Sequence, residues 1–209
     1  MTKPTIQRQG GFTLVELLVA MAVFTFMLLI ISVSFIGIIH ITQSGTASRN
    51  AQQTSRLILE TVERQLRSSQ RVAAVMDPAS GGRLGRLCLY TDGRYVQYAV
   101  DGANNLRVGD IALPAFDTCA APSAATLATW QLLNDNATSV RRFVPTTSVA
   151  IGSGLDGGTA SLQLSVTGNG ISPAELTADQ SACLPGAVSQ FCSVTNLATS
   201  AELRGGLSR

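Results

Sequence analysis

The chain has 209 residues, a formal net charge of +2 at pH 7 and only 13% charged residues. A net charge this close to zero argues against a strongly basic protein that binds nucleic acid without sequence preference. The length suits one membrane helix followed by one globular domain of ordinary size.

A long apolar stretch near the N-terminus is the first element along the chain. None of the 23 residues in 17–39 is charged and none is proline. A bilayer core requires roughly 20 apolar residues in a helix, whereas the apolar core of a secretory signal has only about 7–15. Lys3 and Arg8 precede the stretch, and the first charge beyond it is Arg49. Because positive residues stay on the cytoplasmic side, we expect a membrane helix with its N-terminus in the cytoplasm and the remaining chain outside.

Glu16 stands at the start of this apolar stretch. An ionised carboxylate in or near hydrocarbon is costly unless it has a partner, and no basic side chain lies within one helical turn of Glu16. A cut after Gly11 would create a charged α-amine on Phe12, four residues before the glutamate. That amine could pair with the carboxylate of its own chain or of a neighbouring chain. The alternative is a signal anchor whose glutamate lies in the headgroup layer.

The string Gly11-Phe12-Thr13-Leu14-Val15-Glu16, after a short basic leader, resembles the class III signal of type IV pilins and type II secretion pseudopilins. The resemblance implies that a membrane-embedded aspartyl prepilin peptidase cuts between Gly11 and Phe12 and methylates the new N-terminus. Glu16 matches the glutamate that, in this family, aids docking of a subunit onto the growing filament. One departure is that the first glycine of the apolar helix is Gly37, whereas many major pilins carry helix-breaking residues earlier.

These patterns divide the chain into four parts. Residues 1–11 are expected to be a prepilin leader, and 12–41 the membrane-spanning or filament-core half of a long helix. Residues 42–76 are expected to form its amphipathic outer half, and 77–209 a β-rich periplasmic or extracellular domain. Without Lys3 and Arg8 of the leader, the formal net charge falls from +2 to 0.

The outer half of the helix is predicted from apolar residues at helical spacing. Glu60–Arg64 and Glu63–Arg67 are spaced as i,i+4 pairs in the favourable orientation. The charged face is either a contact surface for neighbouring subunits or a solvated helix face. The apolar stripe consists of Leu59, Val62, Leu66, Ala73 and Met76. We expect Asp77-Pro78 to end the helix.

The remaining chain is predicted to form short strands separated by turns. Strands are expected at 84–90 and 95–100 around the hairpin turn 91–94, at 106–108, within 140–151 and at 161–166. Residues 117–129 are expected to be a loop, and 130–133 either a strand or a helical turn. The fold class is therefore α+β, and it is similar to the pilin fold, in which an antiparallel sheet packs against the outer half of the long helix.

Four cysteines all lie in the part expected outside the cytoplasm, where disulfides form by default. They are Cys88, Cys119, Cys183 and Cys192. Four cysteines allow three pairings, and the sequence does not decide among them. We expect Cys183–Cys192, because these two bracket a short loop, and then Cys88–Cys119 by elimination. The resemblance makes the first pair the counterpart of the disulfide-bounded loop of pilins, which is either a partner-binding segment or an inert surface loop.

No pattern indicates catalysis, a cofactor or a metal. The single histidine, His40, lies at the outer edge of the membrane span, and no cysteine belongs to a C-x-x-C pair. The glycine-rich stretch 152–158 lacks the Lys-Ser/Thr ending of a phosphate loop and is interpreted as a turn. We therefore expect a protein that is not an enzyme and has no small-molecule substrate.

The sequence favours a minor pilin or pseudopilin subunit that is processed and then incorporated into a type IV pilus or type II secretion pseudopilus, or primes its assembly. Its expected partners are the prepilin peptidase, other pilin or pseudopilin subunits through the N-terminal helix, the inner-membrane assembly platform and membrane lipid. The expected location is the inner membrane, crossed once, and a filament after assembly.

Two alternatives remain open. The first is a filament-tip binding module, an adhesin or a DNA-uptake receptor, and the second is a signal-anchored envelope protein that never polymerises. DNA binding would require that folding gathers the arginines of the outer domain into one track. These are Arg83, Arg86, Arg94, Arg107, Arg141 and Arg142.

Overall fold

The computed structural model describes residues 13–112, 115, 118–148, 158–168, 171–185 and 192–202, without the side chains at 37, 40, 41, 43 and 44. The leader 1–11, Phe12, the side chain of His40 and nearly all of the stretch 152–158 lie outside the described residues. The chain divides into two compact units, Met1–Thr42 and Gln43–Arg209.

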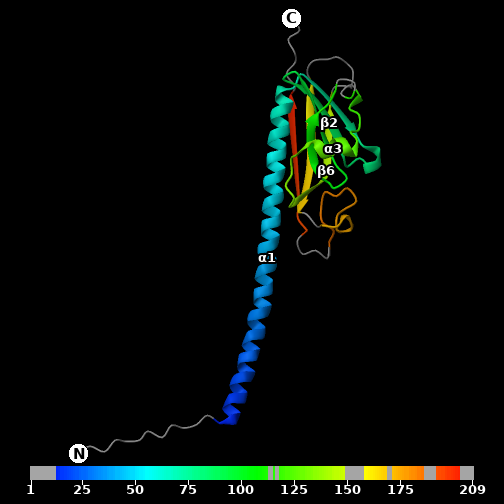
Figure 1. The fold of residues 1–209 in the computed structure, drawn as a ribbon. Coiled ribbons are helices and arrows are strands. Elements are labelled where there is room, and N and C mark those ends of the chain that lie inside the picture. Colours follow the sequence, from blue (N-terminus) through cyan, green and yellow to red (C-terminus); the bar gives the residue numbers. More distant parts are fainter. Residues whose placement is uncertain are drawn as a thin grey trace, which may run out of the picture. The chain divides into compact units, whose positions relative to one another are not determined.

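The first unit consists, in its described part, of the beginning of helix α1, which runs without interruption over Leu14–Ser68 (Figure 1). Its segment Leu14–Ile36 has a mean hydropathy of 2.7, and none of it is buried by other parts of the protein. At about 1.5 Å per residue, 23 residues reach roughly 35 Å, enough to cross the ~30 Å hydrocarbon core of a bilayer.

The hydroxyl groups within this apolar segment are all bonded inside the helix. Thr25 Oγ1 donates to the Met21 carbonyl oxygen at 3.0 Å, and Ser32 and Ser34 donate to the carbonyl oxygens four residues earlier at 2.7 and 2.9 Å. Hydrocarbon offers no acceptor for such groups. The three polar residues are thus compatible with a membrane-spanning helix.

In the second unit, α1 buries one stripe of side chains and leaves the opposite face exposed. Ala51, Ser55, Ile58 and Val62 are fully buried, and Leu66 is nearly so. Their spacing of three and four residues places them on one face of the helix. The sequence pattern for Leu59, Val62 and Leu66 is therefore correct.

The helix ends earlier than the sequence pattern predicted. It stops at Ser68, and Arg71–Met76 forms strand β1 instead of a last helical turn. Val72 faces the main core, whereas Ala73 packs against the cluster around Cys88 and Cys119. Successive side chains therefore point to opposite faces, as they do in a β-strand. Backbone pairing with β2 (Gly85–Thr91) over all six residues of β1 outweighs the helical spacing of Ala73 and Met76. Asp77-Pro78 begins the short 3-10 helix η1 (Pro78–Ser80) and does not end α1.

The first sheet has five antiparallel strands in the order β1-β2-β3-β4-β5. Strand β3 covers Arg94–Val100, β4 Leu106–Asp110 and β5 Gln131–Leu132. The hairpin between β2 and β3 turns at Asp92 and Gly93, whose φ angles of 50° and 78° fit a type I′ turn. The strands expected at 84–90, 95–100 and 106–108 are confirmed, and 130–133 contains a strand.

The second sheet has three antiparallel strands in the order β6-β7-β8. Strand β6 covers Thr138–Thr147, β7 Thr159–Gly168 and β8 Val194–Glu202. Strands β6 and β7 were expected, whereas β8 was missed because its Ala, Ser and Thr residues give little apolar pattern. Leu84 and Phe143 form an isolated parallel bridge that links the beginning of β2 to β6.

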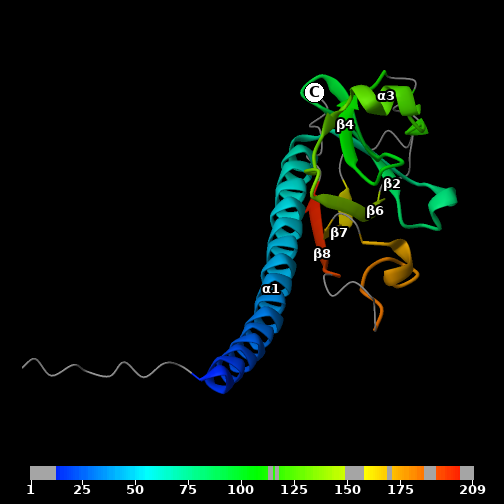
Figure 2. The ribbon, with the colours of Figure 1, turned by 60° about the horizontal axis from the view of Figure 1, so that its bottom comes forward.

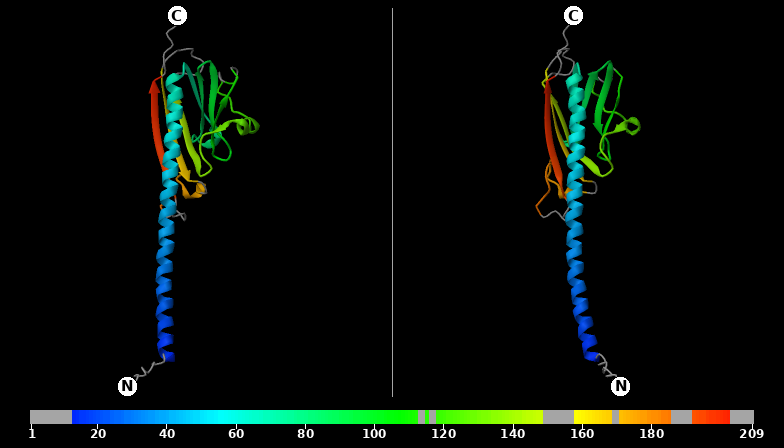
Figure 3. Two further views of the ribbon diagram at one scale, coloured as in Figure 1. Left: turned by 60° about the vertical axis from the view of Figure 1, so that its left-hand side comes forward. Right: turned by 90° about the vertical axis from the view of Figure 1, so that its left-hand side faces the viewer.

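The main core lies between the outer half of α1 and the inner faces of both sheets. Tyr98 of β3, Phe143 of β6 and Leu162 of β7 are fully buried in it. Figure 3 shows β8 on one side of the outer half of α1 and the five-stranded sheet on the other. The Tyr98 hydroxyl donates to Gln65 Oε1 at 2.7 Å, and burial raises the pKa of this tyrosine well above its usual range. The predicted α+β class, with a long helix packed on antiparallel sheet, is confirmed.

Residues 117–129 were expected to be a loop but contain helix α3 (Ala124–Thr129). Ser123 caps this helix, because its hydroxyl oxygen accepts a hydrogen bond from the backbone N–H of Thr126 at 3.1 Å. Helix α3 lies beside β4 (Figure 2). Just after it, the indole of Trp130 covers Gly109, whose place could not be taken by a larger residue without moving the ring.

Two disulfide bonds, Cys88–Cys119 and Cys183–Cys192, are present in the structure. They are the pairs expected from the sequence. Cys88 and Cys119 are fully buried, and together with Ala73 they form a small second core on the outer face of the five-stranded sheet.

Gly109→Ala should destabilise the second unit. A Cβ atom at this position would lie 2.3–2.5 Å from three atoms of the Trp130 ring, so the ring must shift, at a cost of about 1–3 kcal/mol. Gly102→Ala is the matched control, because nothing lies within 4 Å of its Cβ position. Urea unfolding of the full chain in detergent micelles measures both variants. Equal stabilities would contradict this account of the Trp130 contact.

The two disulfides should differ in their contribution to stability. Their cysteines are separated by 31 and 9 residues. By loop-closure entropy alone, Cys88→Ala/Cys119→Ala should lose about 1 kcal/mol more than Cys183→Ala/Cys192→Ala. The two double variants are compared by the same urea unfolding. An equal or reversed order would show that the loop lengths do not govern the difference.

Candidate functional site

The start of α1 is closed by two reciprocal hydrogen bonds between Thr13 and Glu16. The Thr13 backbone N–H donates to Glu16 Oε2 at 3.0 Å, and the Glu16 backbone N–H donates to Thr13 Oγ1 at 3.3 Å. The Thr13 hydroxyl also donates to Glu16 Oε2 at 3.0 Å. This arrangement is a capping box, in which two N–H groups that the helix cannot satisfy receive side-chain acceptors.

The capping box changes the interpretation of Glu16. The sequence analysis found no basic partner for this carboxylate, but the structure provides two neutral donors from Thr13. The positive end of the helix dipole also favours a negative charge in the first turn. The carboxylate is therefore stabilised within its own chain. The spacing Thr-x-x-Glu was a recognisable signal for this cap in the sequence.

The remaining residues of the predicted processing site, Gly11 and Phe12, lie outside the described residues. The residue next to Phe12 is Thr13, whose backbone N–H is bonded to Glu16.

The apolar surface beyond the cap goes all the way round the helix. The large apolar side chains from Leu14 to Ile38 are 45–77% exposed in the single chain. A helix that is apolar on every side is stable only in a bilayer or among other apolar helices.

Several of the arginines that DNA binding would require have partners within the chain. Several are held by neighbouring groups: Arg86 Nε donates to the Cys119 carbonyl at 3.1 Å, Arg107 Nε pairs with Asp101 Oδ2 at 2.7 Å, and Arg83 Nε donates to the Ser80 carbonyl at 3.0 Å. Arg141 is only 7% exposed. Burial and the nearby charge of Arg83 lower the pKa of Arg141.

Of the two charged pairs expected on the outer face of α1, one is present. Arg67 Nη2 contacts Glu63 Oε1, whereas no ion pair joins Glu60 and Arg64 in the described part of the chain. Nor do the described residues contain a cluster of three or more His, Cys, Asp or Glu side chains with a metal-binding arrangement.

A comparison with protein-family models matches residues 6–32 to the prokaryotic N-terminal methylation motif. Searches of curated proteins and of solved structures gave no match. The match covers the predicted cleavage junction, Glu16 and the first part of the apolar helix. It confirms the resemblance found in the sequence: the chain carries a class III prepilin signal and is type IV pilin-like in this part.

The class III signal implies processing by a prepilin peptidase and assembly with other pilin subunits. Together with the apolar helix, it fits a membrane-anchored pilin.

Thr13→Ala should loosen the first turn of α1. Loss of the hydroxyl acceptor for the Glu16 N–H costs about 1 kcal/mol, which is about fivefold in local opening. Hydrogen exchange at the Glu16 amide of the full chain in micelles measures this opening. Thr13→Ser should restore protection, and Thr25→Ala is the control, because its hydroxyl bonds carbonyl oxygens only. Unchanged exchange in Thr13→Ala would contradict the capping role.

Proposed function

We propose that this chain is a minor pilin or pseudopilin subunit, cut between Gly11 and Phe12, N-methylated at Phe12 and incorporated into a type IV pilus or type II secretion pseudopilus, or priming its assembly. The observation that carries the proposal is the methylation motif over residues 6–32, which overlaps the apolar helical segment Leu14–Ile36. The work of the protein is structural, through packing, and involves no substrate turnover.

We assign a different role to each part of the chain. Residues 1–11 are the leader, and 12–41 enter the membrane and then the helical bundle of the filament. The rest of α1, to Ser68, and strand β1 (Arg71–Met76) belong to the outer domain. We place the N-terminus in the cytoplasm and the outer domain in the periplasm or outside the cell, because Lys3 and Arg8 precede the span. The partners are the prepilin peptidase, other subunits, the inner-membrane assembly platform and lipid.

A minor role, in place of a major one, is supported by the size of the outer domain. It carries two sheets with five and three strands and two disulfides. A subunit of this kind presents a large individual surface for contacts with specific neighbours.

Glu16 is the residue we assign to assembly. In the free subunit its carboxylate is held by Thr13, at 3.0 Å from both the backbone N–H and the hydroxyl group. After processing, the amine of Phe12 in a neighbouring subunit offers a charged donor in place of these neutral ones. The exchange of partners neutralises both charges inside the bundle and sets the axial step between helices.

The test is the intact mass and N-terminal residue of the protein recovered from its native membrane, for the original chain and for Glu16→Gln. Both should begin at N-methyl-Phe12, but Glu16→Gln should lose at least tenfold in filament incorporation, because it cannot form the ion pair. Glu60→Gln, an exposed glutamate on the outer helix with no ion pair in the described part, is the matched control and should incorporate normally.

An uncut Met1 start, in cells with active prepilin peptidase, would refute the processing proposal. Normal incorporation of Glu16→Gln would leave processing intact and refute the assembly role of the carboxylate.

A further inference from the structure

Strand β8 is the last strand of the three-stranded sheet, and only one of its two edges is paired. The strand at the other edge of this sheet, β6, is partly covered. The backbone N–H groups of Val140 and Phe143 donate to the carbonyl oxygens of Asn104 and Arg83 at 2.8 and 2.9 Å. No such hydrogen bond joins the outer edge of β8 to another described residue.

The strand register shows which backbone groups of β8 point away from β7. In an antiparallel sheet, a residue directs its N–H and its C=O to the same neighbouring strand, and the next residue directs them to the other side. The Thr159 carbonyl oxygen accepts from the Ser148 N–H at 2.9 Å, so the odd-numbered residues of β7 face β6. The even-numbered residues of β7 then bond the odd-numbered residues of β8, with which they are in register. The backbone N–H and C=O groups of Asn196, Ala198 and Ser200 therefore point out of the sheet.

This edge is accessible. Asn196, Ala198 and Ser200 are all exposed. Alanine and serine have small side chains, which leave room for a second backbone beside the strand. Figure 3 shows β8 at the margin of the domain, to one side of α1. A further strand can therefore approach the edge from outside.

Strand β8 runs alongside the outer half of α1 and in the same direction. Gly168, at the end of β7 and beside the start of β8, lies next to Ala47: a Cβ atom on the glycine would be 3.5 Å from the alanine Cβ. At the other end of β8, Ser200 lines one hollow together with Arg64 and Arg67 of α1. A strand added to this edge would thus lie along the helix.

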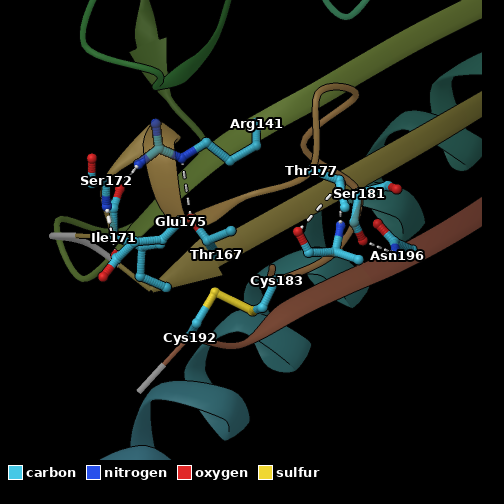
Figure 4. Close-up of a disulfide and its surroundings, with 11 residues drawn as sticks. Arg141, Thr167, Ile171, Ser172, Glu175, Thr177, Ser181, Cys183, Cys192 and Asn196 are labelled. Atoms are coloured by element: carbon cyan, nitrogen blue, oxygen red, sulfur yellow. Dashed lines mark hydrogen bonds between the residues drawn. A yellow bond between two sulfur atoms is a disulfide. The ribbon is translucent and has the colours of Figure 1, made fainter. Parts of the chain in front are cut away.

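The start of β8 is held in place by side chains, not by its outward backbone groups. Asn196 Oδ1 accepts from the Ser165 hydroxyl at 2.5 Å, and Asn196 Nδ2 donates to the Ser181 carbonyl oxygen at 2.6 Å (Figure 4). Two residues before the strand, Cys192 is joined to Cys183. The edge is therefore ordered before any partner arrives, which lowers the entropic cost of binding.

The sequence of β8 lacks the features by which edge strands usually avoid pairing with other chains. Such features are a short length, a proline, a charged side chain or a bulge. Strand β8 has nine residues, no proline, no charge from Val194 to Ala201, and an unbroken register with β7. By contrast, β5, at one edge of the five-stranded sheet, has only two residues.

The direction of β8 argues against a second copy of the same strand as the occupant. A symmetric pair of β8 strands would be antiparallel and would point the two α1 helices in opposite directions. Two chains anchored by α1 in one membrane cannot adopt that arrangement. The side chains along the edge are uncharged, so a partner strand of uncharged, β-forming residues fits beside them.

We propose that the outer edge of β8 is extended by an uncharged β-strand of a different polypeptide, whose backbone pairs with Asn196, Ala198 and Ser200. About five residues in extended conformation span these three positions. Their N–H and C=O groups provide the partners that the edge lacks, and the sheet gains a fourth strand. That the other polypeptide is a neighbouring filament subunit rests on the proposed function; the pairing at this edge does not.

The first test is hydrogen exchange, followed by NMR, on the isotope-labelled full chain in micelles without any partner. The amides of Leu197 and Thr199, which face β7, should be protected, whereas those of Ala198 and Ser200 should exchange at nearly the rate of an unstructured peptide. Protection of Ala198 and Ser200 in the isolated chain would overturn the proposal, because the edge would then be occupied without a different polypeptide.

The second test finds the partner in cells that assemble the filament. A photo-reactive residue replaces Ser200, and the cross-linked polypeptide is identified by mass spectrometry. Ala198→Pro removes one outward N–H and leaves the bonds to β7 intact, so the yield of the cross-link should fall roughly tenfold. Ala198→Val is the matched control: it keeps the N–H and should cross-link as the original chain does.

Equal yields in Ala198→Pro and Ala198→Val would show that backbone pairing is not used. If Ala198→Pro folds poorly, Ala198→Lys takes its place, because it keeps the N–H but puts a charge on the edge, and it should also lower the yield. A cross-link to a second copy of β8 would overturn the choice of partner.

The N-terminal residue of the cross-linked chain separates this proposal from the proposed function. A chain that starts at Phe12 and enters the filament without any cross-link would overturn the pairing at β8 and leave the proposed function intact. A cross-link to a different polypeptide formed by an uncut chain would support the pairing and refute the processing.

Discussion

Polar groups in hydrocarbon have to find partners in their own chain, and the first unit of this protein depends on that constraint. The helix provides the partners by two local devices. Thr13 and Glu16 close the first turn reciprocally, and the hydroxyls further along donate to carbonyl oxygens of the preceding turn. With these groups satisfied, the remaining surface of Leu14–Ile36 is apolar and can enter either lipid or a bundle of similar helices. The same cap leaves Glu16 bonded to the neutral donors of Thr13.

In the second unit, α1 buries only one stripe of its side chains. The two sheets cover that stripe, with Ile58, Val62 and Leu66 opposite Tyr98 and Phe143 in a shared core. One bonded bridge at Leu84 and Phe143 connects the sheets. The remaining face of the helix is charged, which leaves it available to solvent or to neighbouring subunits.

The outer face of the three-stranded sheet is organised by a single irregularity. Without the bulge in β6, Val140 and Phe143 would point to opposite faces, and one of them would leave the core. The bulge keeps both inside and turns Arg141 and Arg142 outward, where they hold the segment closed by Cys183–Cys192. The feature that completes the core thus also anchors the segment 171–185 to the outer face of the sheet.

The match of residues 6–32 concerns local sequence, and there prediction from the sequence works well. The cleavage string, the apolar span, Glu16 and the stripe Leu59, Val62 and Leu66 depend on neighbours along one helix. The Thr13–Glu16 cap was also readable from its spacing. These features follow from contacts within a few residues, so the sequence contains all the information that they need.

The parts that the sequence alone did not determine depend on residues distant in the chain. Ala73 and Met76 fit helical spacing, but pairing with β2 makes Arg71–Met76 a strand. Strand β8 lacks a strong apolar pattern and forms because its whole length pairs with β7. The orientation of the Arg142 guanidinium group follows from its contact with Asp179, 37 residues away. Only the tertiary structure decided these features, because backbone pairing and ion contacts between distant segments outweigh the weak preferences of the local sequence.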